Sequence, residues 1–119
     1  MSNYFERIDT VFLYVSDLEK SIEWYTTVLG LKLIWNMGEY AALSVAKGET
    51  PLTLAQVPKE EICTSTWEKF NFFTSDIDKV QEALIVNGVE ADPINEADGV
   101  RFFNFKDPDG NTLGACYFE

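Results

Sequence analysis

The side chains that could support catalysis or metal binding are unevenly represented in this chain. Its 119 residues include 20 Asp and Glu but no histidine. Histidine is the usual general base near neutral pH and the commonest nitrogen ligand for zinc, iron and nickel. Ser, Thr and Cys nucleophiles therefore lack an imidazole to activate them, and a histidine-based metal centre is excluded.

The two cysteines, Cys63 and Cys116, do not form a Cys-x-x-Cys pair. In a cytosolic chain such thiols stay reduced, and we interpret both as ordinary thiols. The alternative is that Cys116 is reactive or faces a ligand.

The charge balance argues against nucleic acid as a partner. Nine Lys and Arg face 20 Asp and Glu, so the formal net charge is −11 and phosphate backbones are repelled. This charge either serves solubility alone or attracts a cationic ligand to a pocket. We find neither the roughly 20 consecutive apolar residues of a membrane helix nor a secretory signal, so we expect a cytoplasmic protein that does not bind membranes.

Two matching stretches indicate which elements position the reactive residues. Residues 10–19 (TVFLYVSDLE) and residues 69–78 (KFNFFTSDID) are each an apolar, β-prone run that ends in Ser-Asp, an apolar residue and an acid. Ser16 with Glu19 is a capping box, which predicts a helix start, and Ser75 with Asp78 is a weaker version. The chain therefore reads as two strand-then-helix modules.

Hydrophobic periodicity and turn residues extend each module to the order β-α-β-β-β. Gly30 and Gly88 are the expected ends of the two helices. We predict one domain, residues 1–119, with module 1 at about 8–57, a connector at 58–67 and module 2 at about 68–118. The predicted strands are 8–15, 31–37, 40–46, 52–57, 69–74, 89–94, 100–105 and 112–118; the helices are 17–29 and 76–87, and residues 95–99 form a loop.

Three phrases give the sequence its resemblance to a known family. Residues 15–19 read VSDLE, residues 24–31 begin with Trp-Tyr and end with Leu-Gly-Leu, and residues 107–111 read DPDGN before the last strand. In this order they resemble the vicinal oxygen chelate superfamily, the glyoxalase, bleomycin resistance protein and dioxygenase group. The resemblance spans residues 8–118. It implies an α+β fold in which two βαβββ modules form an incompletely closed β-barrel cup, with the helices outside.

This fold assigns a face to each strand residue. Thr10, Phe12 and Tyr14 are expected to face the cup, and Val11, Leu13 and Val15 the first helix. In module 2, Lys69, Asn71 and Phe73 are expected to face the cup, and Phe70, Phe72 and Thr74 the second helix.

The metalloenzymes of the resembled family bind a divalent ion with His or Glu at four cup-facing positions. Here these positions hold Thr10, Thr53, Lys69 and Gly114, with Gln56 as the alternative to Thr53. None is a His or a carboxylate, and Lys69 would repel a cation. We therefore predict no metal and no cofactor. The alternative is a displaced site that uses Asp9, Gln56 or Glu119.

We predict a ligand site in the cup. Aromatic side chains suit flat or extended ligands; the alternative for each of them is a place in the core or in a dimer contact. The candidate ligand-binding residues are Thr10, Phe12, Tyr14, Trp35, Thr53, Lys69, Asn71, Phe73, Phe103 and Gly114, and Trp67 is a further stacking candidate. Lys69, if buried among Phe12, Phe73 and Phe105, would have a lowered pKa and could act as a base or an anion anchor; otherwise it reaches the rim or pairs with an acid.

Three functions remain open from the sequence. The first is metal-independent binding of a small organic molecule, aromatic or cationic, as in sequestration of a toxin or antibiotic by a homodimer. The second is a lyase or isomerase that uses Lys69, Tyr14 or Cys116 in place of a metal. The third is a non-catalytic, dimeric accessory or regulatory module.

Overall fold

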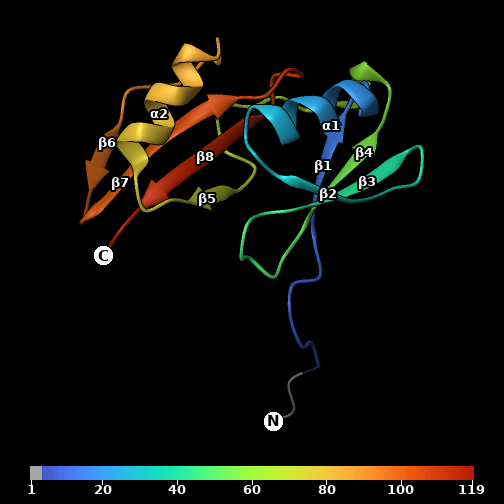
Figure 1. The fold of residues 1–119 in the computed structure, drawn as a ribbon, viewed down its shortest axis with the longest axis horizontal. Helices are drawn as coiled ribbons and strands as arrows, with labels where there is room; N and C mark the ends of the chain where they lie inside the picture. Colours follow the sequence, from blue (N-terminus) through green and yellow to red (C-terminus); the bar gives the residue numbers. More distant parts are fainter. Residues whose placement is uncertain (1–3) are drawn as a thin grey trace. The chain divides into compact units, whose positions relative to one another are not determined.

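The computed structural model describes residues 4–119, which fold as two compact units that divide between Ile62 and Cys63. The division falls inside the connector predicted at residues 58–67. Each unit contains one α-helix and one four-stranded sheet (Figure 1). We refer to residues up to Ile62 as unit 1 and to residues from Cys63 as unit 2.

The two units repeat one topology. Unit 1 has the strand order β1-β4-β3-β2 and unit 2 the order β5-β8-β7-β6. The first strand of each unit runs parallel to the last, and the remaining pairs are antiparallel. The α+β class and the doubled β-α-β-β-β order are therefore confirmed. The elements are β1 (Val11–Val15), α1 (Leu18–Thr27), β2 (Lys32–Asn36), β3 (Tyr40–Ser44), β4 (Leu52–Gln56), the 3-10 turn η1 (Lys59–Glu61), β5 (Asn71–Phe73), α2 (Ile77–Val86), β6 (Asn95–Ala97), β7 (Val100–Lys106) and β8 (Thr112–Tyr117).

Both helices begin one residue later than the predicted capping boxes require. The N-cap of α1 is Asp17, whose carboxylate accepts a hydrogen bond from the amide of Lys20 at 3.2 Å. The N-cap of α2 is Asp76, which accepts from the amide of Lys79 at 3.3 Å. Assigning the caps to the preceding serines was wrong. An aspartate caps at least as well as a serine, and its charge favours the positive end of the helix dipole.

The glycines predicted to end the helices follow both of them, although α1 ends at Thr27 and α2 at Val86, two residues and one residue earlier than predicted. Gly30 and Gly88 have φ values of +75° and +79°, a left-handed conformation that glycine adopts without steric cost. The amide of Leu31 donates to the carbonyl oxygen of Tyr25 at 3.1 Å and thereby closes the last turn of α1. The chain then returns along the sheet.

The second strand of module 2 lies later in the chain than predicted. Residues 89–94 contribute only an isolated bridge between Ala91 and Phe105, since Pro93 has no amide hydrogen for a ladder. The edge strand is β6, in the predicted loop. It joins β7 through Asp98 and Gly99, whose φ values of +53° and +80° suit a two-residue hairpin. The Asp-Gly pair was the sequence signal for this turn.

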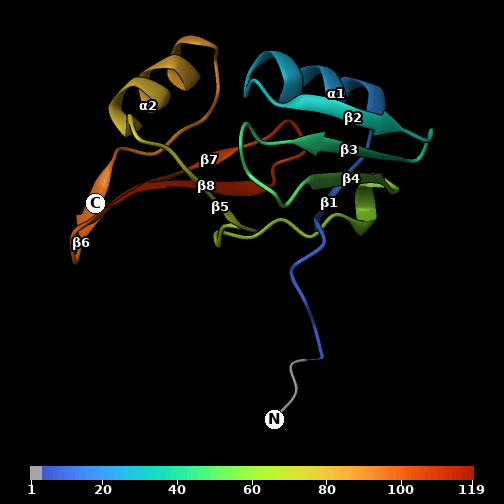
Figure 2. The ribbon, with the colours of Figure 1, turned by 60° about the horizontal axis from the view of Figure 1, so that its bottom comes forward.

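The core of each unit lies between its helix and one face of its sheet (Figure 2). In β1, Leu13 and Val15 are 2% and 0% exposed, whereas Phe12 and Tyr14 are 59% and 52% exposed. The predicted alternation of this strand is confirmed. The face that α1 does not cover therefore carries large aromatic side chains, and this face forms the candidate site.

Candidate functional site

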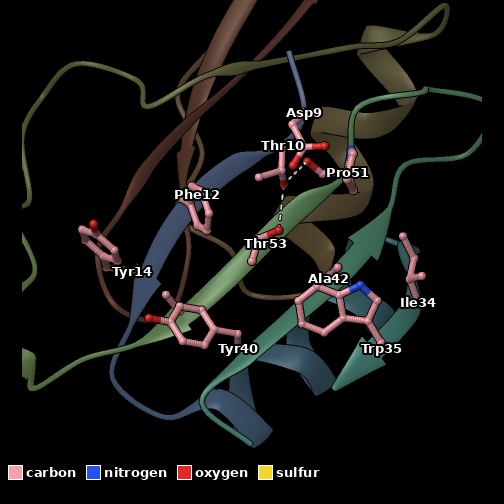
Figure 3. Close-up of a pocket in the computed structure, with 11 residues that line it drawn as sticks. Asp9, Thr10, Phe12, Tyr14, Ile34, Trp35, Tyr40, Ala42, Pro51 and Thr53 are labelled. Carbon is pink, nitrogen blue, oxygen red and sulfur yellow. Dashed lines mark hydrogen bonds between the residues drawn. The ribbon is translucent and has the colours of Figure 1, made fainter. Parts of the chain in front are cut away.

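The sheet of unit 1 has a hollow of about 670 Å³ on the face that carries Phe12 and Tyr14 (Figure 3). All four strands of the unit contribute to its wall. We call this cavity the unit 1 hollow. Its lining consists of Asp9, Thr10, Phe12, Tyr14, Ile34, Trp35, Tyr40, Ala42, Pro51, Thr53 and Ala55.

A bulge in β2 brings two neighbouring side chains to the hollow. The ladder pairs Leu33 with Leu43 and then Trp35 with Ala42, so Ile34 has no partner of its own. An extra residue of this kind bends a strand and redirects its side chains. As a result, Ile34 and Trp35 both line the unit 1 hollow although they are adjacent in sequence.

Two threonines on neighbouring strands are linked by a short hydrogen-bond chain. The hydroxyl of Thr10 donates to the carbonyl oxygen of Pro51 at 2.9 Å, and the hydroxyls of Thr10 and Thr53 lie 2.7 Å apart. A hydroxyl has one proton, so the proton between the two threonines comes from Thr53. Sequence analysis predicted both residues for the same site, and the structure brings them together.

Five predicted ligand-binding residues of module 1 line the unit 1 hollow: Thr10, Phe12, Tyr14, Trp35 and Thr53. Sequence reasoning missed Tyr40, which is 49% exposed and reaches the hollow from β3. The register of β3 could have identified it, because Tyr40 alternates with Ala42 and lies opposite Ala55.

The corresponding face of unit 2 has a different composition. The ladder places Asn71 and Asn104 on either side of Gly114, where unit 1 has Phe12 and Ala42 on either side of Thr53. A side chain at Gly114 would collide with the side chain of Asn71. The predicted neighbours Asn71 and Gly114 are thus brought together.

Lys69 is exposed in unit 2. Its ammonium group donates to the carbonyl oxygen of Cys63 at 2.6 Å. Phe105, one of the rings expected to bury it, is only 3% exposed and contacts Phe72 and Phe103 in the core of the unit. Of the two alternatives for Lys69, burial against Phe105 is therefore wrong, since Phe105 lies on the helix side of its sheet and Lys69 is exposed.

The other aromatic candidates of module 2 occupy different environments. Phe73 is 57% exposed and contacts Phe118, with ring centroids 5.1 Å apart. Phe103 is 1% exposed and belongs to the core, so its assignment to the ligand face was wrong by one residue. In β7 that one-residue shift reverses the face, and Phe102 is the ring on the other side. Trp67 precedes β5 and is 78% exposed.

Cys116 lies partly buried in β8, paired in the ladder with Phe73 and Phe102, whereas Cys63 is exposed. Both thiols are free. Asp78 on α2 and Arg101 on β7 form an ion pair outside the unit 1 hollow. Hydrogen bonds from the Arg101 guanidinium hold the pKa of Asp78 below its usual value.

The positions where the family places metal ligands do not fit a divalent ion. In unit 1, the hydroxyls of Thr10 and Thr53 bind each other. In unit 2, Lys69 supplies a cation and Gly114 no side chain. Within residues 4–119, no three His, Cys, Asp or Glu side chains are close enough together to hold a metal.

The displaced alternative lacks a converging donor set as well. The side-chain oxygen of Gln56 accepts a hydrogen bond from the amide of Leu18 at 2.8 Å, at the start of α1. Asp9 lies 3.4 Å from Arg7 in an exposed ion pair. Glu119 is exposed at the end of unit 2. Hard cations need several oxygen ligands that converge, and these three residues are engaged separately or exposed.

Comparison with known proteins identifies the family. The model of the Glyoxalase/Bleomycin resistance protein/Dioxygenase superfamily matches residues 7–114. The chain belongs to this superfamily. The uncharacterized protein YraH of Bacillus subtilis (strain 168) is 33% identical over 117 residues, which cover 85% of this chain and 90% of YraH.

Solved structures of this superfamily fold share the architecture at low sequence identity. TnmS3, an antibiotic binding protein from Streptomyces sp. CB03234, has a TM-score of 0.85 at 21% identity, covering 99% of this chain and 100% of its own. FosX, a fosfomycin resistance protein from Listeria monocytogenes, has a TM-score of 0.80 at 16% identity, covering 97% and 95%. These similarities establish the fold.

No helix among residues 4–119 has both the length and the apolar composition needed to cross a membrane. The helices α1 and α2 each have 10 residues.

Proposed function

We propose that this superfamily member binds a small organic molecule in the unit 1 hollow, without a metal ion, and thereby sequesters a toxin or an antibiotic. The observation that carries the proposal is the group of four aromatic side chains around the hollow. Phe12, Tyr14, Trp35 and Tyr40 are between 42% and 59% exposed. Large apolar groups left exposed side by side are typical of interaction sites.

The size and lining of the hollow support this proposal. Pockets for small molecules usually measure about 300–1,000 Å³ and combine apolar walls with a few polar groups. The unit 1 hollow has about 670 Å³. Its polar groups include the linked hydroxyls of Thr10 and Thr53. A flat ligand could stack on the rings and use the hydroxyls for orientation.

The residue types support binding rather than metal-dependent chemistry. The unit 1 hollow has hydroxyls where a metal ion would need carboxylates or imidazoles. The antibiotic binding protein TnmS3 shares the fold, which makes sequestration of an antibiotic a reasonable function to test first. Catalytic roles for Lys69, Tyr14 and Cys116 stay predictions from the sequence.

Tryptophan fluorescence tests the proposal. A panel of non-fluorescent aromatic and cationic compounds should change the emission of the wild type through Trp35. Trp35→Phe should abolish this response, whereas Trp67→Phe should retain it, because Trp35 lines the unit 1 hollow and Trp67 is not among the lining residues. A response that depends on Trp67 alone, or no response to any compound, would contradict binding in the hollow. Elemental analysis of the purified protein should find no stoichiometric metal.

We further propose a cytoplasmic homodimer. The edge strand β2 supports an assembly role, since all of its residues are exposed. Unpaired edges readily join another chain. Sedimentation equilibrium would show twice the 13.5 kDa mass of the chain if the dimer forms. A monomer at micromolar concentration would contradict this part of the proposal.

A further inference from the structure

The two ends of the unit 1 hollow differ in polarity. Asp9, Thr10 and Pro51 gather at one end, and the rings of Trp35 and Tyr40 lie at the other (Figure 3). Thr53 lies between them, within hydrogen-bond distance of Thr10. We call the group Asp9, Thr10 and Thr53 the acceptor end.

The side chains of the acceptor end offer a ligand hydrogen-bond acceptors rather than donors. The proton of Thr10 is used on the carbonyl oxygen of Pro51, and the proton of Thr53 is used on Thr10. Both hydroxyl oxygens keep lone pairs that can accept further bonds. Asp9 adds a carboxylate, which accepts only.

The charge of the residues that line the hollow also favours a cationic or hydrogen-bond-donating ligand. Asp9 is the charged side chain among the described residues that line the hollow, and neither Lys nor Arg joins it there. Its partner Arg7 is 3.4 Å away, and both side chains are largely exposed, at 71% and 84%. An exposed ion pair of this kind is weak and is easily exchanged for another cation. An anionic ligand would have no cation to pair with along this lining.

We propose that the ligand of the unit 1 hollow carries a protonated amine, or an equivalent N–H donor, that binds at the acceptor end. Its flat apolar part then lies against Trp35 and Tyr40. This inference rests on the proposed function and specifies the chemical class of the ligand. An ammonium group has several protons and can bond both hydroxyls and the carboxylate, with each bond assisted by its charge.

Three indoles that differ in one group test this inference by isothermal titration calorimetry: tryptamine, tryptophol and indole-3-acetate. They share a ring system and carry an ammonium, a hydroxyl and a carboxylate. Tryptamine should bind most tightly and indole-3-acetate most weakly. We expect a factor of about ten or more between them at low ionic strength, and less as salt is added.

Two variants test whether the preference for an ammonium group arises at the acceptor end. Asp9→Asn should weaken the binding of tryptamine by about threefold to tenfold and leave the binding of tryptophol unchanged, since only the charge is removed. Thr53→Val should weaken both compounds, because it removes an acceptor at nearly constant volume. Glu23→Gln removes the same charge from the exposed side of α1 and should change neither affinity. Thermal unfolding of each variant verifies that it is folded.

The outcomes separate this inference from the proposed function. Equal affinities for the three indoles, or tighter binding of indole-3-acetate, would overturn the inference and leave binding in the hollow intact. An equal loss of tryptamine affinity in Asp9→Asn and Glu23→Gln would also overturn it, because the effect would then be one of net charge. If none of the three binds, the inference fails, and the fluorescence panel with Trp35→Phe decides the proposed function by itself.

Discussion

The two units have one backbone pattern and two different surfaces. Across the middle of each sheet, unit 1 places Phe12, Thr53 and Ala42 in register, where unit 2 places Asn71, Gly114 and Asn104. Two residues further along the strands in each unit, the rows Tyr14–Ala55–Tyr40 and Phe73–Cys116–Phe102 both begin and end in aromatic rings. The repeat therefore preserves the strands, whereas the side chains on this face have diverged.

The cavities differ accordingly. The unit 1 hollow has about 670 Å³ and four aromatic residues in its wall. A cavity in unit 2 measures about 190 Å³ and is lined by Thr66, Glu90, Asp92, Asn104, Phe105, Lys106 and Thr112. Lys106 donates to the hydroxyl of Thr112 at 2.8 Å inside it. Of these two cavities, the one in unit 1 has the volume and the apolar wall that a drug-sized ligand needs.

The largest effect is expected from substitutions in β1, where one face is buried under α1 and the other is exposed. Leu13→Ala should lower the free energy of unfolding by about 2–5 kcal/mol, since Leu13 is buried under α1. Phe12→Ala should cost less than about 1 kcal/mol because half of its surface is already exposed. Urea unfolding of the two variants measures the difference. Equal losses would show that Phe12 is a core residue.

The next effect concerns Trp35 on β2, because the edge strand of unit 2, β6, carries no aromatic ring. Trp35→Ala should weaken the binding of an aromatic ligand by about 1.5–3 kcal/mol, since a large ring in a pocket wall often supplies much of the contact with the ligand. Phe102→Ala in unit 2 is the matched control and should leave affinity within about twofold. Calorimetric titration of both variants compares them. A larger loss in Phe102→Ala would move the site to unit 2.

A smaller effect is expected from giving unit 2 a side chain in the middle of its sheet. Gly114→Ala should destabilise the protein by about 1 kcal/mol, because the new methyl group must displace the amide of Asn71. In the Asn71→Ala background the same change should cost less, and chemical denaturation of the four proteins gives the coupling energy. Additive effects would mean that Asn71 does not occupy the space at Gly114.

The smallest effect is expected at the ion pair of Asp78 with Arg101, which joins α2 to β7 at 2.7 Å and 2.9 Å. Arg101 lowers the pKa of Asp78 in the folded state. The ion pair therefore stabilises the fold at a pH above the pKa that Asp78 has in the unfolded chain, and this stabilisation is lost as the pH falls through the pKa that Asp78 has in the folded chain. Asp78→Asn should lower the melting temperature slightly at pH 7, and the difference should vanish in strong acid. Glu82→Gln, also on α2, should show no such dependence. A difference that persists in acid would mean that the ion pair is not its cause.

The sequence was sufficient for most of the fold because the decisive patterns are local. Strand alternation placed Phe12 and Leu13 on opposite faces, and Gly30 marked the end of a helix. The failures arose where neighbouring residues compete for one role. Ser16 and Asp17 are both capable N-caps, and only the folded chain shows that Asp17 caps α1.

The candidate site was predicted less completely, because it depends on how strands pair. Tyr40 enters the unit 1 hollow through its register with Ala55, and Ile34 joins the predicted Trp35 there through the bulge in β2. Neither the register nor the bulge is visible in single-strand periodicity. Phe103 was misplaced for the same reason, since a shift of one residue exchanges its face with that of Phe102.

The most direct test of binding in the unit 1 hollow is a two-dimensional ¹H–¹⁵N NMR titration with the panel of aromatic cations, alcohols and acids. Each indole N–H gives its own signal, so Trp35 and Trp67 are observed in the same experiment. At least one compound should shift the Trp35 indole and the amides of β1, β3 and β4 while the Trp67 indole stays in place. Shifts confined to unit 2, or an unmoved Trp35 signal throughout the panel, would contradict it.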